Sequence, residues 1–348
     1  MNAAFLIVLV AAVAAAVTWL VRQYAVRASL IDVPNERSSH SEPTPRGGGI
    51  GIFAGLVAGL SAAYGLGWMD RTLFMALVAG GALIAGIGFV DDRRHVSALV
   101  RAAVHFIAAS LALGLLGGLP SLELGGGELT LGAAGWVLGA LGIVWLINLF
   151  NFMDGIDGIA ASEALVVCTI GGLLAYLVGA SSVAVAAALV AAAAAGFLVW
   201  NWDPARIFMG DVGSGLLGYC VAVIALASEN VGGPPLVVWL VLGAAFFVDA
   251  TLTLARRVLR GEKWFQAHRL HAYQRAVQAG LSHGAVTGAV IVLNLMLGAV
   301  AYLMMSDTRK APILLIGALA LVVAVYLVVE RARPMYPDPA SEQVGSRS

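Results

Sequence analysis

Charged residues are scarce in this chain. Lys, Arg, Asp and Glu make up 11% of its 348 residues, against 60% for hydrophobic residues, and the mean hydropathy is +0.91. Soluble domains are about one quarter charged and about half apolar, so the composition excludes a large soluble domain. The formal net charge is zero, which says little, because in a membrane protein the distribution of charge matters more than its sum.

Cysteine is almost absent as well. Cys168 and Cys220 are the two cysteines, each isolated within an apolar run. Because neither has a CxxC or CxxH neighbour, they define no disulfide framework and no zinc site, and we expect both to be reduced and packed in the interior. The phosphate-binding pattern GxxxxGK[ST] is also missing from the sequence, which excludes a Walker-type nucleotide site.

Long apolar runs occupy most of the chain. Only helices or closed barrels satisfy every backbone hydrogen bond in lipid, so uninterrupted runs of this length predict an all-α integral membrane protein. The first run has the length of a span and no basic residue ahead of it, so we interpret it as a span and not as a signal peptide. At roughly twenty residues a span, about eleven transmembrane helices are expected, near residues 3–21, 49–68, 72–90, 99–118, 132–150, 162–180, 182–200, 213–229, 235–255, 284–305 and 311–329.

Basic residues are distributed unequally between the two sets of connections. One set carries 17 of the 20 Lys and Arg residues, and the other holds Arg71, Arg309 and Lys310. The positive-inside bias places the first set in the cytoplasm, the N-terminus in the periplasm and the C-terminus in the cytoplasm. We predict one polytopic membrane domain, residues 1–333, followed by a disordered cytoplasmic tail, residues 334–348.

The polar residues gather in four short segments. If the spans alternate, all four segments emerge on the side with the basic excess, which indicates an enzymatic site at the membrane surface. The segments are VDDRRH (90–95), NLFNFMDGIDG (148–158), FMGDVGSG (208–215) and AHRLHAYQR (267–275).

Two adjacent acids, Asp91 and Asp92, end one expected span. Neighbours on a helix point about 100° apart, so we expect one carboxylate to meet a substrate and the other to orient it or to balance charge. An equal alternative is a solvated helix end paired with Arg93 and Arg94.

Four polar residues, Asn148, Asn151, Asp154 and Asp157, recur at every third position at the end of another span. Adjacent members are neighbours on a helix, and the glycines of DGIDG predict that the helix opens into a loop that brings all four side chains together. A polar helix cap is the alternative, but packing explains two amides and two carboxylates poorly.

Asp211 lies between glycines just before a span. A carboxylate is a hard oxygen ligand suited to Mg²⁺, which takes one or two protein carboxylates and completes its shell with phosphate and water. A plain helix cap is an equal alternative.

Glycine-flanked Arg46 suits a phosphate contact. Asp249, near the inner end of the ninth expected span, is expected to pair with Arg256 or Arg257 or to line the site.

The longest cytoplasmic loop contains His268 and His271 together with six basic residues. Histidines three positions apart could share a zinc ion, but no third ligand occurs at a suitable spacing. Phosphate binding by this loop is the favoured interpretation, and positive-inside topology explains part of its charge.

These motifs in this order, from PTPRGGG to AHRLHAYQR, resemble the polyprenyl-phosphate N-acetylhexosamine-1-phosphate transferases, glycosyltransferase family 4, over nearly the whole chain. The resemblance implies an enzyme of the bacterial inner membrane that transfers N-acetylhexosamine 1-phosphate from a UDP-sugar to undecaprenyl phosphate and releases UMP. It implies Mg²⁺ as the cofactor, with Mn²⁺ as a substitute, and the lipid bilayer as a partner. We expect no nucleic-acid partner and leave a homodimer open.

The resemblance also implies roles for single residues, each matched to the family's motifs. Asp91 matches the acid proposed to engage the lipid phosphate, and Asp92 its partner. The catalytic candidates are Asp91, Asp92, His268 and His271; the substrate-binding candidates are Arg46, Asn148, Asn151, Asp154, Asp157, Asn201 and Phe208; and the metal ligands are Asp211 and Asp154. Among these, Asp157, Asn201 and Phe208 match the uridine pocket, and Leu270 replaces a histidine found in several branches.

The last motif, HRLHAYQR, lacks the three consecutive histidines of the branch that takes the muramyl-pentapeptide nucleotide. It is more similar to enzymes that start O-antigen or other surface polysaccharides. The phospho-muramyl-pentapeptide transferase of peptidoglycan synthesis stays the alternative within the family. The alternative from another class is a secondary transporter, whose polar groups would lie near the bilayer midplane and often within inverted repeats.

Overall fold

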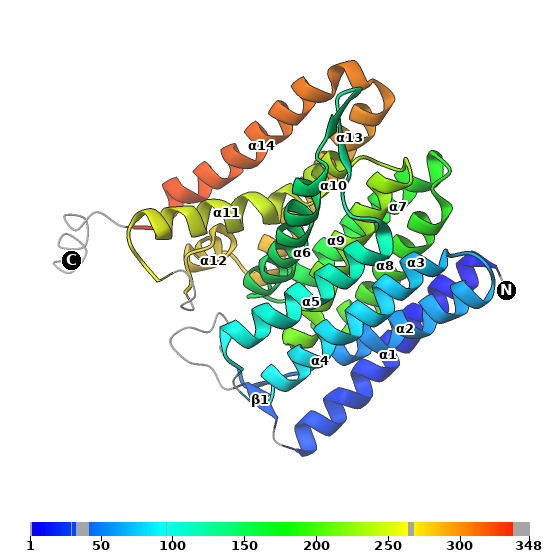
Figure 1. Ribbon diagram of the computed structural model, residues 1–348. Helices are drawn as coiled ribbons and strands as arrows, with labels where there is room; N and C mark the ends of the chain where they lie inside the picture. Colours follow the sequence, from blue (N-terminus) through cyan, green and yellow to red (C-terminus); the bar gives the residue numbers. More distant parts are fainter. Residues whose placement is uncertain (1, 29, 33–41, 95, 264–267, 337–348) are drawn as a thin grey trace.

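The computed structural model describes residues 2–28, 30–32, 42–94, 96–263 and 268–336 (Figure 1). The helices are α1 (Ala3–Arg27), α2 (Gly49–Gly65), α3 (Arg71–Met75), α4 (Gly81–Asp91), α5 (Ala98–Leu116), α6 (Ala133–Met153), α7 (Ile159–Leu177), α8 (Ser181–Asn201), α9 (Asp211–Asn230), α10 (Leu236–Leu242), α11 (Ala244–Leu259), α12 (Ala272–Gln278), α13 (His283–Ser306) and α14 (Ala311–Ala332). A π-helical turn, η1 (Ala76–Gly80), joins α3 to α4, and a 3-10 turn, η2 (Thr308–Lys310), precedes α14. The strands are β1 (Ile31–Asp32), β2 (Thr44–Pro45), β3 (Ser121–Leu124) and β4 (Gly127–Thr130).

Within the described residues, nine helices are long and apolar enough to cross a membrane, and the bent pair of α10 and α11 makes a tenth if it counts as one span. The predicted class, an all-α multi-pass membrane protein, is confirmed. Two of the eleven expected spans differ in detail. α2 lies where expected but has 17 residues, and the expected span at 235–255 breaks at Gly243, where α11 turns by 80° from α10. Cys168 and Cys220 are free and buried, as expected.

Two small antiparallel strand pairs were not expected from the sequence. β1 pairs with β2, and β3 and β4 form a hairpin around Gly125 and Gly126. These glycines have φ values of 58° and 87°, which a two-residue hairpin loop requires and other residues adopt with difficulty. In Figure 1 the hairpin projects at the end of the bundle opposite β1 and α12.

The central helix of the bundle is α9. It is almost completely buried, and α2, α4, α6, α7 and α8 pack around it. Glycines allow these helices to approach closely: a Cβ on Gly218 would lie 2.3 Å from the Leu146 carbonyl oxygen of α6, and a Cβ on Gly49 would lie 2.3 Å from the Gly213 nitrogen. Helices in lipid associate through close packing, because the lipid is as apolar as they are. The small residues therefore decide which elements surround α9.

The end of α4 reaches the first residue of α9 through Gly88. A Cβ on Gly88 would lie 2.5 Å from the Asp211 carbonyl oxygen. Figure 1 shows the end of α4 at the same end of the bundle as β1 and α12, away from the N-terminus. Polar segments that are far apart in the sequence therefore meet around the start of α9.

The C-terminal segment corrects one predicted boundary. Met335 is buried, and Tyr336 donates from its hydroxyl to Glu262 Oε1 at 2.8 Å while the Arg260 guanidinium lies 3.6 Å from its ring centroid. Residues 334–336 thus pack against the fold, so the tail predicted at 334–348 begins too early. Residues 337–348 lie outside the described residues.

Replacing Gly88 with alanine should separate α4 from α9. We expect Gly88→Ala to lower the free energy of unfolding by about 1–3 kcal/mol, the usual effect of overpacking a tight contact, and to reduce activity. The measurement is thermal unfolding of the purified protein in detergent.

Gly86, two residues earlier on α4, is the matched control. It is exposed, and a Cβ there would meet nothing within 4 Å. Gly86→Ala should leave stability and activity unchanged. Equal behaviour of the two variants would contradict the close contact between α4 and α9.

Candidate active site

Two carboxylates from distant parts of the chain meet at an arginine of α5. Arg101 Nη1 lies 2.6 Å from Asp91 Oδ2 and 3.4 Å from Asp211 Oδ2. Asn151, near the end of α6, donates from Nδ2 to Asp211 Oδ1 at 3.0 Å and is also 3.2 Å from Ser214 Oγ. The first turn of α9 is therefore connected to α4, α5 and α6 by polar side chains.

Asp92 binds the N-terminus of α9. Its Oδ1 accepts from the Asp211 backbone N–H at 2.9 Å, and its Oδ2 accepts from the Val212 N–H at 3.4 Å. Gly210 makes this approach possible: it has a φ of 74°, and a Cβ there would lie 2.5 Å from Asp92 Oδ2. A carboxylate at a helix N-terminus satisfies free N–H groups and the positive end of the helix dipole.

The two adjacent acids thus have different partners, as their helical geometry predicts. Asp91 accepts from the Val96 N–H at 2.7 Å and from Arg101. The alternative of pairing with Arg93 and Arg94 is wrong for Asp91, because Arg101 is its partner and the Arg93 guanidinium lies 3.9 Å from the Phe89 ring centroid.

Asp154 follows α6 and completes what we call the acidic cluster, Asp91, Asp92, Asp154 and Asp211. Burial raises the pKa of Asp154 to about 7; the Arg46 guanidinium opposes this shift, and the carboxylates of Asp211, Asp92 and Asp157 add to it. Burial also raises the pKa of Asp92, again against Arg46. Arg46 is therefore close enough to act on both carboxylates, and the cluster holds more negative charge than Arg46 and Arg101 neutralise.

The donor set of the acidic cluster fits a magnesium ion. Its ligands would be hard carboxylate oxygens, and a divalent cation would offset the burial and the mutual repulsion that raise the pKa of Asp154 and Asp92. The predicted ligands Asp154 and Asp211 both belong to it. We therefore keep Mg²⁺ as a prediction for this end of the bundle.

The run of four polar residues does not converge as expected. α6 ends at Met153, so the predicted opening of the helix is confirmed. Asn148, however, donates from Nδ2 to the Val144 carbonyl oxygen of its own helix at 2.7 Å. Asn151 and Asp154 lie with the acidic cluster, whereas Asp157 takes part in a separate group. The prediction that all four side chains meet is wrong, because Asn148 bonds to its own helix and the loop after α6 carries Asp157 to partners of its own.

That separate group, which we call the loop clamp, consists of Asp157, Asp203 and His283. His283 Nδ1 lies 3.3 Å from Asp157 Oδ1, and potential ligand atoms of the three residues lie within 4.8 Å of one another. Asp157 also accepts from the Ala205 N–H at 2.9 Å, and Asp203 from the Gly284 N–H at 2.7 Å. The clamp joins the loop after α6, the loop after α8 and the start of α13.

Next to the loop clamp, the side chain of Asn201 binds two backbone groups. It is 3% exposed; its Oδ1 accepts from the Gly158 N–H and its Nδ2 donates to the Ile207 carbonyl, both at 3.0 Å. Both ends of its amide are bound to backbone, and its match to the uridine pocket stays a prediction. It supports the loop that carries Phe208.

Phe208 is half-buried and lies beside the loop of Arg46. Its N–H donates to the Pro45 carbonyl at 2.8 Å, and its carbonyl accepts from the Gly48 N–H at 2.9 Å. These bonds bring the motif PTPRGGG against FMGDVGSG. Stacking of the ring on uracil stays a prediction.

Asp249 holds the histidine motif in place. Its Oδ1 lies 3.4 Å from His271 Nδ1 and accepts from the Ala272 N–H at 2.8 Å, and its Oδ2 accepts from the Tyr273 N–H at 3.2 Å. The expected pairing with Arg256 or Arg257 is wrong, and the other expectation, that Asp249 lines the site, stays a prediction. Those residues bind other acids, namely Glu330 for Arg256 and Glu262 for Arg257.

His271 and His268 lie against each other beside the end of α6. Their ring centroids are 4.8 Å apart, and the His271 ring is 6.3 Å from that of Phe152. Burial, helped by the charges of His271 and Arg257, lowers the pKa of His268 to about 3. This shift favours the neutral imidazole near pH 7, and phosphate binding by the loop stays a prediction. His40 and His95 lie outside the described residues.

Sequence reasoning missed three residues of these groups, Arg101, Asp203 and His283. Arg101 lies one turn inside α5, and its position between two carboxylates depends on the packing of α4, α5 and α9. A signal was present: Ser97 caps α5, which places Arg101 at the same depth as Asp91.

Comparison with known proteins agrees with this arrangement. The sequence profile of glycosyl transferase family 4 matches residues 74–229. A decaprenyl-phosphate N-acetylglucosaminephosphotransferase of Mycobacterium tuberculosis is 33% identical over 92% of this chain and 87% of its own length. The chain belongs to glycosyl transferase family 4. A probable undecaprenyl-phosphate N-acetylglucosaminyl 1-phosphate transferase of Bacillus subtilis is 30% identical over 77% of this chain and 75% of its own.

A third family 4 relative comes from Salmonella typhimurium. This undecaprenyl-phosphate alpha-N-acetylglucosaminyl 1-phosphate transferase is 31% identical over 76% of the present chain and 73% of its own. The prediction that the chain is a transferase of the phosphotransferase type is thereby confirmed. The family match includes Asp91, Asp92, Asp154 and Asp211 but ends before the histidine motif.

Asp249 can be tested as the residue that positions His271. Asp249→Asn removes the charge that faces His271 Nδ1, so we expect turnover to fall about a hundredfold, the lower range for loss of a positioned acid–base group. The matched control is Thr253→Val, because Thr253 donates to the same carboxylate at 3.0 Å and its loss leaves the contact with His271 in place. Similar turnover in both variants, measured at equal amounts of folded protein, would contradict this role.

Proposed function

We propose that this enzyme transfers N-acetylglucosamine 1-phosphate from UDP-N-acetylglucosamine to a polyprenyl phosphate, undecaprenyl phosphate in the simplest case, and releases UMP. The observation that carries the proposal is the acidic cluster, which gathers four carboxylates and the arginines Arg46 and Arg101 at one end of a membrane bundle. The relatives reported above are named for N-acetylglucosamine phosphate and polyprenyl phosphate, which supports this donor and acceptor.

The location of the cluster suits both substrates. A polyprenyl tail stays in the hydrocarbon, while a nucleotide sugar comes from water, so the reaction belongs at the interface. The positive-inside bias supports the cytoplasmic face of a bacterial plasma membrane, with the N-terminus in the periplasm. The product is a lipid diphosphate sugar of the kind on which an O-antigen or another envelope glycan is assembled.

A transporter is disfavoured, because the acids lie at helix ends.

The reaction we propose is a single displacement. An oxygen of the lipid phosphate attacks the β-phosphorus of the nucleotide sugar, the bond to the bridging oxygen breaks, and UMP leaves with that oxygen. A phosphate monoester has a second pKa of about 6, so near neutral pH the attacking group has already lost its proton. The main task of the protein is to hold two anions together.

The residues of the site suit this task. Arg46 and Arg101 supply fixed positive charge, and the N-terminus of α9 adds the dipole of a buried helix. Mg²⁺, held by Asp211 with Asp154, would neutralise charge on the diphosphate. Asp91 is bound to Arg101 and to the Val96 N–H, which suits orientation better than removal of a proton.

A covalent route through Asp91 is the alternative. The Asp91 carboxylate would attack the donor, release UMP and form a phospho-enzyme before the lipid arrives. Both of its oxygens already accept hydrogen bonds, which reduces its nucleophilicity and favours displacement.

Asp211→Asn tests the proposed metal ligand. We expect it to remove at least 99% of UMP release, since one metal-held transition-state interaction is worth about 3–4 kcal/mol, and to shift the Mg²⁺ dependence of the remaining activity. Asp307→Asn, at the N-terminus of η2 away from the cluster, should retain full activity. Unchanged activity of folded Asp211→Asn, or full activity in excess chelator, would reject the metal role.

Isotope exchange separates the two routes. With direct displacement, labelled UMP should enter UDP-N-acetylglucosamine only when polyprenyl phosphate is present. Exchange in acceptor-free, delipidated protein would instead support the covalent route through Asp91.

A further inference from the structure

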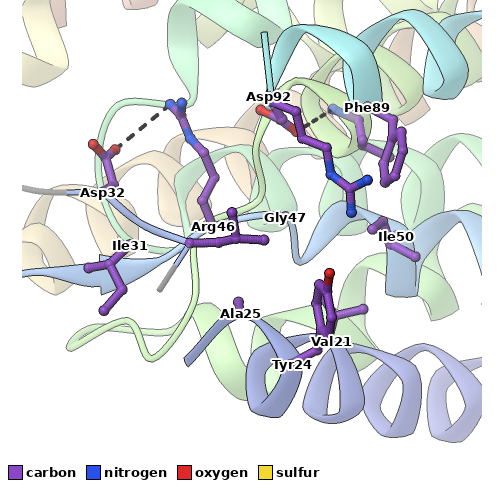
Figure 2. Close-up of a pocket in the computed structure, with 13 residues that line it drawn as sticks. Val21, Tyr24, Ala25, Ile31, Asp32, Arg46, Gly47, Ile50, Phe89 and Asp92 are labelled. Atoms are coloured by element: carbon purple, nitrogen blue, oxygen red, sulfur yellow. Dashed lines mark hydrogen bonds and ion pairs between the residues drawn. The ribbon is translucent and has the colours of Figure 1, made fainter. Parts of the chain in front are cut away.

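A cavity of about 270 Å³ lies between the C-terminal end of α1 and the end of α4, with Arg46 and Asp92 in its lining (Figure 2). It belongs to the site described above. Another polar feature belongs to neither the acidic cluster nor the loop clamp. Glu163 on α7 and Asn294 on α13 meet inside the bundle, each 1% exposed. An ionisable side chain inside a membrane bundle is costly to keep, so it calls for a physical explanation.

This buried pair contains two oxygens that lack a donor. Asn294 Nδ2 donates to Glu163 Oε2 at 2.5 Å. The other carboxyl oxygen, Glu163 Oε1, and the amide oxygen, Asn294 Oδ1, are buried and accept no hydrogen bond from the described residues. Burial of an acceptor without a donor is unfavourable, and burial of an ionised carboxylate without a cation is far more so.

A single proton on the carboxyl group supplies the missing donor. A neutral carboxylic acid has one O–H donor beside its second oxygen, and a carboxamide has N–H donors beside its oxygen. The two groups can therefore bond reciprocally, with N–H to the carboxyl oxygen and O–H to the amide oxygen. Protonation of Glu163 thus satisfies its own second oxygen and that of Asn294 together.

The surroundings of the pair contain no charge that would favour an ionised Glu163. The ion pairs among the described residues all involve other acids. The residues three and four positions away on α7 and α13, and around Gly243, are uncharged: Ile159, Ala160, Val166, Val167, Val290, Ile291, Leu297, Gly298, Trp239, Leu240, Phe246 and Phe247.

The pair also lies at the break between α10 and α11. A Cβ on Gly243 would lie 3.9 Å from Glu163 Oε1, and Gly243 is the residue at which α11 turns by 80° from α10. α10 packs against both α7 and α13. Further along α11, Asp249 binds the histidine motif at His271 and Ala272. The direction of α11 after the break therefore determines where that motif lies.

We propose that Glu163 is a positioning residue that carries a proton at neutral pH and forms a reciprocal pair of hydrogen bonds with Asn294. The pair joins α7 to α13 beside Gly243 and fixes the direction in which α11 leaves the break. Through Asp249 it holds His271 in place. The effect on turnover rests on the proposed function, whereas the protonation of Glu163 does not.

Infrared spectroscopy of the purified protein, in a detergent without ester groups, tests the proton. A protonated carboxyl group has a C=O stretching band separate from the bands of a carboxylate. The difference spectrum between wild type and Glu163→Gln at pH 7 should contain this band. Ser162→Ala, which changes a neighbouring buried side chain without a partner among the described residues, should retain it. A difference spectrum with carboxylate bands alone overturns the proposal.

Thermal unfolding tests the opposite charge state. An ionised Glu163 would need a cation, and its carboxylate with the Asn294 amide oxygen could bind Na⁺. We expect the unfolding temperatures of wild type and Glu163→Gln to respond equally when Na⁺ replaces choline. Stabilisation by Na⁺ in wild type that is lost in Glu163→Gln overturns the proposal.

Turnover of UDP-N-acetylglucosamine tests the positioning role. Glutamine offers a donor and an acceptor like a neutral acid, so Glu163→Gln should keep kcat within about twofold of wild type. Glu163→Leu leaves the Asn294 amide unpaired and should lower kcat about tenfold, as the displacement of a positioned group does. Ser162→Ala should leave kcat unchanged. Wild-type kcat in folded Glu163→Leu, or an equal loss in Glu163→Gln, overturns the role.

Asp249→Asn provides a readout that a general loss of stability would not produce. If Glu163 acts through Asp249 and His271, Glu163→Leu should cause no further loss of kcat in the Asp249→Asn protein, because residues that act through one another are not additive. A further loss of about tenfold in the double variant, measured at equal amounts of folded protein, overturns this route.

The wild-type protein separates this inference from the proposed function. If it releases no UMP with any polyprenyl phosphate, the proposed function fails and the positioning role fails with it, while the infrared band still decides the proton on Glu163. If it is active and the band is missing from the difference spectrum, the assignment of Glu163 fails and the function stands.

Discussion

The close approach of α4, α2 and α6 to the first half of α9 is the constraint on which the site depends. Each contact is made at a glycine whose Cβ would overlap backbone, as at Gly88, Gly49 and Gly218. In lipid the hydrophobic effect does not drive helices together, so close packing between small residues takes its place. The same contacts bring Asp91, Asp92 and the PTPRGGG loop to the first turn of α9.

The site concentrates negative charge at the ends of several helices. The acidic cluster is stabilised by partners of three kinds, namely guanidinium groups, backbone N–H groups and the amide of Asn151. Asp92 shows the principle: its partly buried carboxylate binds the N–H groups at the start of α9, so it stabilises that helix end and forms part of the site wall. A second group, the loop clamp, joins the adjoining loops through Asp157, Asp203 and His283.

Motif reasoning predicted that the polar segments gather at one end of the bundle but not how single side chains are oriented. PTPRGGG and FMGDVGSG do lie together through backbone bonds between Phe208, Pro45 and Gly48. Asn148, by contrast, donates a hydrogen bond within its own helix, and buried Asn201 donates to the backbone of the loop after α8. Asp249 faces His271, and its expected arginine partners pair with Glu330 and Glu262. Short sequence motifs locate a loop to within a few residues, whereas one helical position turns a side chain by about 100°.

The sequence by itself determined the membrane class, the approximate positions of the helices, the uneven distribution of basic residues and the segments that carry carboxylates and histidines. These properties follow from local composition, because length and apolarity decide whether a segment enters lipid. Only the tertiary structure decided that Arg101 joins Asp91 to Asp211, that α10 and α11 bend at Gly243 and that a cavity opens between α1 and α4. Such features depend on the rotation and depth of helices that are distant in the chain, and no local pattern contains that information.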